Sequence, residues 1–533
     1  SMHAPVTTTT EIRYRQRTFR PQTIFQALYA PDGTSIVFSA APTGSTPYLY
    51  SLRPEFAEPV KVTDQPLQLL SVSKTGELAV LTHPTWVGHR LCTGTLARMP
   101  LAGGAPREIL GNVFQAAWSP DGSDLAILRN LEGVFRLEYP IGKVLAQTGA
   151  YFSDLRFSPD GKHIAFFVHP AYGDDRGGVA VVDLSGKQTM LADGYWGEEG
   201  IAWSPDSRTV YFSAGTGYAD FTIYAVTLDR QVRIAAQSAG GLVIHDISPG
   251  GQWLASRDDV NVLMRAHTPE MTGERDVSWQ EYSQPIAITR DGTSFLFTNS
   301  GMSAGTNYQA CMRKTDGSPV IVLGEGGGLD LSRDGAWAAA GIFPNRCILY
   351  PTGAGEAKEL ATQSIAQIRD MRFFSDGTHV VVVGGPEKEA TRAYLVDITG
   401  KDAPRPITKP GVIRAYPGPD GTQLLLQDGD GKYSLMSIDS SYTRVPVPGL
   451  TTGDDFASWT DDGRGVVISH TSVPGSLDMV DIRSGARKTV HTLDPGVPGA
   501  LSIQQVVTTP DARTYVYDVL TYVSRLYTME GAH

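Results

Sequence analysis

Short apolar runs alternate along the chain with turns rich in glycine, proline and aspartate. The runs SIVFSA (35–40), HIAFFVH (163–169), TVYFSAG (209–215) and HVVVVGG (379–385) each follow such a turn directly. They are apolar at consecutive positions rather than at every second one, which indicates strands that are covered on both faces. No helical period persists for more than a turn or two, so the pattern predicts an all-β fold.

The turn in front of each run is nearly the same four residues, as in Ser158-Pro159-Asp160-Gly161. Proline presets φ at the first central position, aspartate caps the turn and glycine accepts a positive φ. The fourth residues of these turns stand at positions 33, 76, 122, 161, 207, 251, 292, 335, 377, 421, 463 and 512. Their mean spacing of about 43.5 residues is typical of a four-stranded propeller blade. The sequence therefore predicts a β-propeller with twelve four-stranded repeats.

Twelve repeats favour two six-bladed propellers in tandem, because single propellers usually have four to eight blades. One twelve-bladed ring is the alternative. The last repeat ends after its third strand, whereas IRYRQRTFRP (12–21) near the N-terminus resembles an unpaired fourth strand, and pairing the two suits either arrangement. We expect a tag remnant and linker at 1–10, a first propeller at 11–280 and a second at 281–533.

The charge balance narrows the range of partners. Lys and Arg number 45 against 56 Asp and Glu, a net charge of -11, so the chain presents no basic stripe for nucleic acid. No apolar run reaches the length of about 18 residues that a membrane helix needs, so we expect no membrane contact by this segment. Ser1 ahead of Met2 resembles a remnant of tag cleavage, which is compatible with a piece cut from a larger protein and with a native anchor that has been cut away.

The three cysteines, Cys92, Cys311 and Cys347, are too few and too far apart for a disulfide framework or a CxxC metal site. Cys311 and Cys347 hold similar places in consecutive repeats, so a bridge between them stays open, although free buried thiols are the simpler expectation. We expect no metal and no cofactor.

The repeat SPDGKHIAF (158–166), followed by a strand ending in VDLSGK (182–187), resembles the TolB-like Pro-Asp propeller repeat. Other phrases resemble the C-terminal propeller region of eukaryotic-type bacterial serine/threonine kinases. These phrases are TGTLARMPLAGGAPREIL (93–110), YPIGKVL (139–145), HDISPGGQWLASRDD (245–259) and RKTDGSPVIVLGEG (313–326). The chain has no glycine-rich loop before a strand lysine, no HRD loop and no DFG, so it lacks the kinase parts themselves.

This resemblance implies a sensor or docking module that follows a kinase domain and a membrane span. An extracytoplasmic, periplasmic location is then favoured, with a cytoplasmic one as the alternative. The threonine-rich start, APVTTTTEIRYR (4–15), suits a linker from such a segment.

Three short motifs resemble catalytic or ligand sites but lack the surroundings these need. GMSAG (301–305) fits a nucleophile elbow without the following helix, and GEGGG (324–328) resembles a phosphate loop without a helix or a Lys-Ser/Thr pair. Asp428 and Asp430 alternate as in a calcium loop but lack its remaining ligands. We interpret all three as turns or connections.

The loops expected around the propeller axis carry aromatic residues beside carboxylates, nearly all in the first half of the chain. Such a set suits a cationic ligand or a peptide, through cation–π contacts and charge pairing. The candidate ligand-binding residues are Trp86, His89, His169, Tyr172, Asp174, Asp175, Arg176, Tyr195, Trp196, Glu198, Glu199, Tyr218, Asp220, Arg257, Asp258 and Asp259.

The sequence thus favours a non-enzymatic β-propeller that binds a peptide, a protein or a small polar ligand, as the sensor or interaction module of a bacterial kinase. One alternative is a hydrolase or lyase with carboxylates in the propeller channel, which predicts paired Asp or Glu with perturbed pKa values. A structural scaffold is the other alternative.

Overall fold

The computed structural model describes residues 11–88, 90–171, 173–216, 221–387, 389–439 and 441–533. Apart from one short 3₁₀ helix, η1 (Met302–Ala304), the regular elements of these ranges are all strands. The chain divides into two compact units, Ser1–Asp259 with Tyr522–His533, and Val260–Thr521. The all-β prediction is therefore confirmed.

The first unit is built of antiparallel blades whose strands follow one another in the chain. In chain order its strands are β1 (Arg13–Gln16), β2 (Thr23–Tyr29), β3 (Ile36–Ala41), β4 (Tyr48–Leu52), β5 (Val60–Lys61), β6 (Leu67–Val72), β7 (Glu77–Gly88), β8 (Leu91–Pro100), β9 (Arg107–Trp118), β10 (Leu125–Leu131), β11 (Val134–Glu138), β12 (Val144–Thr148), β13 (Tyr151–Phe157), β14 (His163–His169), β15 (Gly177–Asp183), β16 (Gln188–Tyr195), β17 (Gly197–Trp203), β18 (Thr209–Gly215), β19 (Thr222–Thr227), β20 (Val232–Ala236) and β21 (Val243–Ile247), then parts of β22 (Trp253–His267) and β45 (Tyr515–Glu530). Strand β9 ends one blade against β8 and begins the next against β10, so two blades form one seven-stranded sheet.

The second unit repeats this plan in five four-stranded sheets and a sixth around β44 and β45. Its further strands are β23 (Arg275–Asp276), β24 (Ser283–Ile288), β25 (Ser294–Asn299), β26 (Gln309–Lys314), β27 (Ile321–Glu325), β28 (Gly327–Leu331), β29 (Trp337–Ile342), β30 (Arg346–Pro351), β31 (Lys358–Glu359), β32 (Gln367–Phe373), β33 (His379–Gly385), β34 (Arg392–Asp397), β35 (Arg405–Pro406), β36 (Val412–Pro417), β37 (Gln423–Asp428), β38 (Tyr433–Ser437), β39 (Arg444–Pro446), β40 (Asp455–Trp459), β41 (Gly465–His470), β42 (Gly475–Asp481), β43 (Arg487–Leu493) and β44 (Ala500–Thr508).

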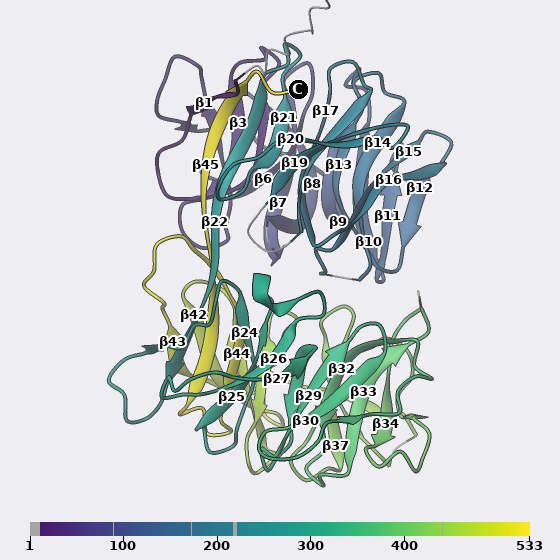
Figure 1. Cartoon of the computed structure of the whole chain (residues 1–533), viewed down its shortest axis with the longest axis vertical. Helices are drawn as coiled ribbons and strands as arrows, with labels where there is room; N and C mark the ends of the chain where they lie inside the picture. Colours follow the sequence, from purple (N-terminus) through teal and green to yellow (C-terminus); the bar gives the residue numbers. More distant parts are fainter. Residues whose placement is uncertain (1–10, 89, 172, 217–220, 388, 440) are drawn as a thin grey trace, which may run out of the picture. The chain divides into compact units, whose positions relative to one another are not determined.

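Each unit closes on itself, because its first innermost strand contacts its last: β2 contacts β21, and β24 contacts β44. The described strands thus make two rings of six blades, and the single twelve-bladed ring is not formed. Strands β21, β22, β45 and β1 lie side by side in one sheet (Figure 1). The predicted terminal strand near residue 12 is β1, which pairs with β45 from Arg13 opposite Glu530 to Gln16 opposite Tyr527.

The two units divide at 259/260 and again at 521/522, whereas the sequence prediction places one boundary at 280/281. The difference arises because β22 and β45 are 15 and 16 residues long and each gives part of its length to each unit. Because each of these strands continues from one unit into the other, the sequence has no linker-like composition at the division.

The repeated turn takes the conformation that its sequence predicts. All twelve fourth residues have positive φ, including the two that are not glycine, Ser207 (63°) and Ala512 (58°). The second strands behind these turns are buried on both faces, as in β3 and β33. Their side chains fill the space between neighbouring blades, for example Ile164, Phe166 and Val182 in one interblade core.

The state of the three cysteines answers whether a disulfide forms. Cys92, Cys311 and Cys347 are free and buried, so the bridge left open between the last two is not formed. Burial raises the thiol pKa of Cys311 to about 12, which keeps it protonated.

In the described part of the chain, no helix is long and apolar enough to cross a membrane.

Closure of the first unit by the C-terminal strand predicts a large effect of Leu526→Ala. Leu526 is fully buried against Ile24, Phe38 and Leu254, so its truncation should lower the free energy of unfolding by about 2–5 kcal/mol. Leu184 is exposed and provides the control, since Leu184→Ala should change the free energy of unfolding by less than about 0.5 kcal/mol. Urea unfolding measures both, and equal small losses would contradict closure by β45.

Candidate active site at the centre of the first unit

The innermost strand of every blade in the first unit carries a register irregularity near its middle. The irregularity lies between Ser153 and Arg156 in β13, between Glu199 and Ile201 in β17, and between Ile244 and Asp246 in β21. Strands β2 and β6 show the same feature, and β9 shows it opposite Leu128 and Arg129. A bulge redirects side chains, and bulges are common beside active sites.

These irregular segments surround a cavity of about 50 Å³. Because the innermost strands of all six blades contribute to it, the cavity lies at the centre of the ring. Its lining residues are Phe25, Gln26, Gln68, Arg90, Leu91, Gln115, Tyr151, Ser153, Asp154, His169, Asp175, Glu198, Glu199, Gly200, Val243 and His245. By this measure about 10–15 Å³ holds one water, so the cavity has room for a few waters or a small polar group.

Ser153 and His169 form a hydrogen-bonded pair in this cavity. Ser153 Oγ lies 2.7 Å from His169 Nε2, and His169 Nδ1 lies 2.8 Å from the carbonyl oxygen of Arg176. A carbonyl can only accept, so Nδ1 carries the proton and Nε2 is left to accept from the Ser153 hydroxyl. Burial lowers the pKa of His169, which favours the neutral ring and leaves it ready to take a proton.

Glu198 is a buried carboxyl group on β17. Its side chain is almost completely buried, and among the described residues neither carboxyl oxygen has a hydrogen-bond partner. Burial first, and then the nearby charges of Asp193, Asp154 and Asp175, raise the pKa of Glu198 well above 4.5. The raised pKa favours the neutral form of Glu198, whose O–H can donate as a general acid or an oxyanion-stabilising group requires.

Asp154 and Gly200 link two neighbouring bulges. Asp154 has a φ of 52°, and its Oδ2 accepts the Gly200 N–H at 3.0 Å. A Cβ at Gly200 would stand 2.1 Å from the Ile244 carbonyl oxygen, and φ there is +80°, so only glycine fits. Burial raises the pKa of Asp154 despite that hydrogen bond.

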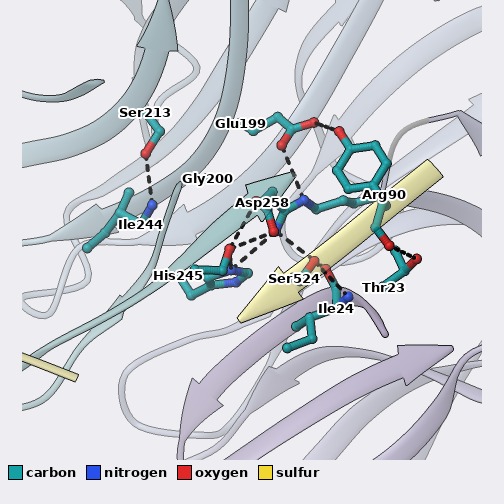
Figure 2. A network of polar contacts seen from close by, with 12 residues as sticks. Thr23, Ile24, Arg90, Glu199, Gly200, Ser213, Ile244, His245, Asp258 and Ser524 are labelled. Carbon is teal, nitrogen blue, oxygen red and sulfur yellow. Dashed lines mark hydrogen bonds and ion pairs between the residues drawn. The ribbon is translucent and has the colours of Figure 1, made fainter. Parts of the chain in front are cut away.

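Arg90 joins the opposite side of the cavity into one network (Figure 2). Its guanidinium forms ion pairs with Glu199, at 3.2 Å, and with Asp258. Its Nη1 also lies 3.2 Å from His245 Nε2 and 3.3 Å from Ser256 Oγ. The Tyr522 hydroxyl donates to Glu199 at 3.1 Å, so this carboxylate is held from two sides.

His245 is a buried member of this network. Burial, together with the charges of Arg90 and Arg156, lowers the pKa of His245 well below 6.5. Its Nε2 lies 2.8 Å from Ser256 Oγ. The lowered pKa favours the neutral ring, which can share hydrogen bonds with Arg90 and Ser256.

The structure brings some of the predicted site residues to this cavity. His169, Asp175, Glu198 and Glu199 line it. Asp258 reaches it through its ion pair with Arg90, and Arg176 through its backbone carbonyl.

Other predicted residues are placed elsewhere. Asp174 binds the Arg176 side chain, Asp259 pairs with Arg525, and Arg257 lies beside Gly240. Tyr195 packs on Phe212 and Tyr224, and burial raises its pKa to about 12. Trp86 in β7 and Trp196 before β17 are not among the lining residues. His89, Tyr172, Tyr218 and Asp220 lie outside the described residues.

Sequence analysis missed several lining residues, all but one of which belong to strands rather than loops; the exception, Arg90, lies in the turn between β7 and β8. They are Gln26, Gln68, Arg90, Gln115, Ser153, Asp154 and His245. The available signal was a polar residue in the middle of an otherwise apolar inner strand, as in YFSDLRF (151–157). Within the described ranges, no group of three or more His, Cys, Asp or Glu side chains has the arrangement to hold a metal ion.

Comparison with known proteins gives one family match. Residues 122–239 match the SMP-30/gluconolactonase/LRE-like region. That segment contains Ser153, Asp154, His169, Glu198 and Glu199. No curated protein sequence matches the chain.

Two solved structures show weaker similarity. The tricorn protease is 14% identical over 93% of this chain, at a TM-score of 0.30, and the match spans 57% of the tricorn chain's length. An oligogalacturonate lyase from Vibrio parahaemolyticus is 12% identical over 73% of this chain and 94% of its own, at a TM-score of 0.33. At these TM-scores neither similarity carries an argument about activity.

The family match corrects the functional prediction. The main prediction, that the chain is the sensor or interaction module of a bacterial kinase, is wrong. The matched segment is similar to a family whose description includes a gluconolactonase. The propeller part of the resemblance is confirmed, whereas the comparisons show no link to TolB-like repeats or to kinases. The same match weighs against the expectation that the chain is not an enzyme.

The raised pKa of Glu198 predicts a contribution to the pH dependence of stability that the Glu198→Gln variant lacks. The unfolded side chain titrates near 4.5 and the folded one at higher pH, so between these values the folded state binds one proton more. The free energy of unfolding should therefore fall as pH rises above 4.5, by up to about 1.4 kcal/mol per unit, and level off above the folded pKa. Urea unfolding from pH 4.5 to 8 tests this, and parallel profiles for parent and variant would refute a protonated Glu198.

Proposed function

We propose that this chain is a hydrolase that cleaves an ester or lactone in the central cavity of the first unit. The observation that carries the proposal is the placement of His169. Its Nδ1–H donates to the Arg176 carbonyl oxygen, which fixes the tautomer, so that Nε2 accepts from the Ser153 hydroxyl. The lactonase-like family match to residues 122–239, which hold this pair, supports it.

The first step forms a bond between Ser153 Oγ and the substrate carbonyl carbon. As it forms, the Ser153 proton passes to His169 Nε2, which is neutral and accepting before the reaction. The imidazolium that results gains from the charges of Asp175, Asp174 and Asp154, which favour protonated His169. Its Nδ1–H stays bound to the Arg176 carbonyl, in the orienting role that a carboxylate fills in other serine hydrolases.

Glu198 acts on the other side of the carbonyl group. Negative charge develops on the carbonyl oxygen as Ser153 attacks, and a neutral carboxylic acid can donate a hydrogen bond to it. Because Glu198 has no other described partner, its O–H is available for this bond.

The remaining steps also move protons through His169. Protonated His169 gives its proton to the departing alkoxide as the C–O bond breaks, which leaves an acyl group on Ser153. Water then attacks the acyl carbon and passes a proton to His169. As the bond from the acyl carbon to Ser153 Oγ breaks, His169 gives that proton to Oγ, and the carboxylic acid is released.

The shape of the cavity limits the substrate. A space of about 50 Å³, enough for a few waters, admits a small polar group that contains the reacting carbonyl, and the rest of a larger molecule would lie outside it. The amide side chains of Gln26, Gln68 and Gln115 reach the lining from three successive blades, and amides bind hydroxyl groups in either direction. A small hydroxylated ester or lactone fits these features.

Loss of the nucleophile should abolish most of the activity. With p-nitrophenyl acetate and a sugar δ-lactone as substrates, Ser153→Ala should lower kcat by about 10³-fold or more. His169→Ala should cost about as much, and the double variant no more than the larger single loss, because the two residues act as one unit. Hydrolysis is followed by absorbance and by pH-stat.

Ser185 lies in an exposed turn of the same blade, so Ser185→Ala is the matched control and should retain full activity. Glu198→Gln should lower kcat by about 10²-fold, as for loss of an oxyanion donor. Full activity in Ser153→Ala with loss in Glu198→Gln would exclude a serine nucleophile and favour a carboxylate mechanism.

A further inference from the structure

The second unit contains a cavity of its own, which the proposed hydrolysis does not use. Its volume is about 230 Å³, and it lies where the innermost strands of this unit run into their repeated turns. Five aromatic residues from three blades face it: Phe373, Phe374, Tyr416, Phe456 and Trp459. Arg290, Arg333 and Arg372 line it as well.

Two arginines bridge the cavity between turns that are not neighbours in the ring. Arg290 follows β24 and pairs with Asp461, which follows β40, so the bridge passes over the blade of β44. Arg333 follows β28 and donates to the Pro419 carbonyl oxygen, beyond β36, at 3.2 Å. Exposed contacts of this kind are weak, so a ligand can displace them at little cost.

The inner wall combines a fixed charge with stacked rings. Arg372 Nε lies 3.2 Å from Asp370 Oδ2, and its guanidinium lies over the Tyr416 ring at 5.4 Å. The Phe456 ring stacks on the Tyr416 ring, with ring centroids 4.0 Å apart. Trp459 Nε1 donates to the Tyr416 carbonyl oxygen at 3.3 Å. This wall therefore presents a rigid aromatic surface.

The charged groups around the cavity are unevenly paired. Arg372 is offset by Asp370 and Asp330, and Arg290 is offset by Asp461. Arg333 is exposed, and in the part of the chain that the structure describes no carboxylate forms an ion pair with it. The cavity thus holds one guanidinium whose only described bond is to a neutral carbonyl.

We propose that this cavity binds a carboxylate attached to a ring, with the carboxylate on Arg333 and the ring against Phe456 and Trp459. A guanidinium binds a carboxylate through two parallel hydrogen bonds, which the single bond to the Pro419 carbonyl does not provide. Arg290 can add a second contact when it leaves Asp461. The ring gains from burial on the aromatic wall, so charge and ring are both needed.

Benzoate is the probe, titrated into the full-length chain by saturation-transfer NMR, with acetate and benzyl alcohol as ligands that lack the ring or the charge. Benzoate should bind with a Kd of about 1 mM, and each of the other two at least about tenfold more weakly. Arg333→Gln should weaken benzoate binding about fivefold, the effect of one exposed charge pair. Arg464 is exposed and outside the lining, so Arg464→Gln is the matched control and should bind like the parent.

Three outcomes would overturn the proposal. These are no benzoate binding at about 10 mM, equal binding of benzyl alcohol and benzoate, and equal affinities of the Arg333→Gln and Arg464→Gln variants. The last would place the ligand elsewhere on the chain. Thermal unfolding of both variants checks that the second unit is intact.

Discussion

The bulge in each innermost strand is the constraint on which both rings depend. A bulge releases backbone N–H groups from the ladder at the centre of the ring, where an unpaired donor is costly. Polar side chains satisfy these donors: Asp154 accepts from Gly200, Ser213 from Ile244, and Thr298 from Gly328. Asp518 accepts from both bulge residues of β44, Gln504 and Gln505. Acceptors are therefore required where the blades converge.

The same requirement prepares the centre of the first unit for chemistry. Acceptors placed there are buried, and burial raises the pKa of carboxyl groups such as Asp154 and Glu198. Asp154 is needed for its hydrogen bond to Gly200, whereas Glu198 has no described partner and nothing in the backbone that it satisfies. A buried carboxyl group without a structural task is costly to the fold, and such groups cluster at functional sites.

The sequence predicts the fold far better than the site. The spacing of the turns fixes the blade, because Gly161 and its equivalents need a positive φ that the motif supplies. The division between units is not visible, since β22 and β45 run through it as uninterrupted strands. In the sequence, Ser153 and Asp154 look like ordinary strand residues. The register shift after Ser153, which pairs with Phe167, and before Arg156, which pairs with Ala165, directs this segment to the cavity. The long-range partner of Ser153, His169, stands at the far end of the next strand, where its role depends on register.

The most direct test of the proposed centre is covalent labelling of Ser153. Methanesulfonyl fluoride is small enough for a narrow cavity and reacts with a serine whose proton is taken by a neighbouring base. Peptide mass spectrometry after brief exposure of the folded chain should show one sulfonylated residue, Ser153, and no adduct in the His169→Asn variant. An unlabelled Ser153, or one labelled equally with and without His169, would contradict an activated serine at the centre of the first unit.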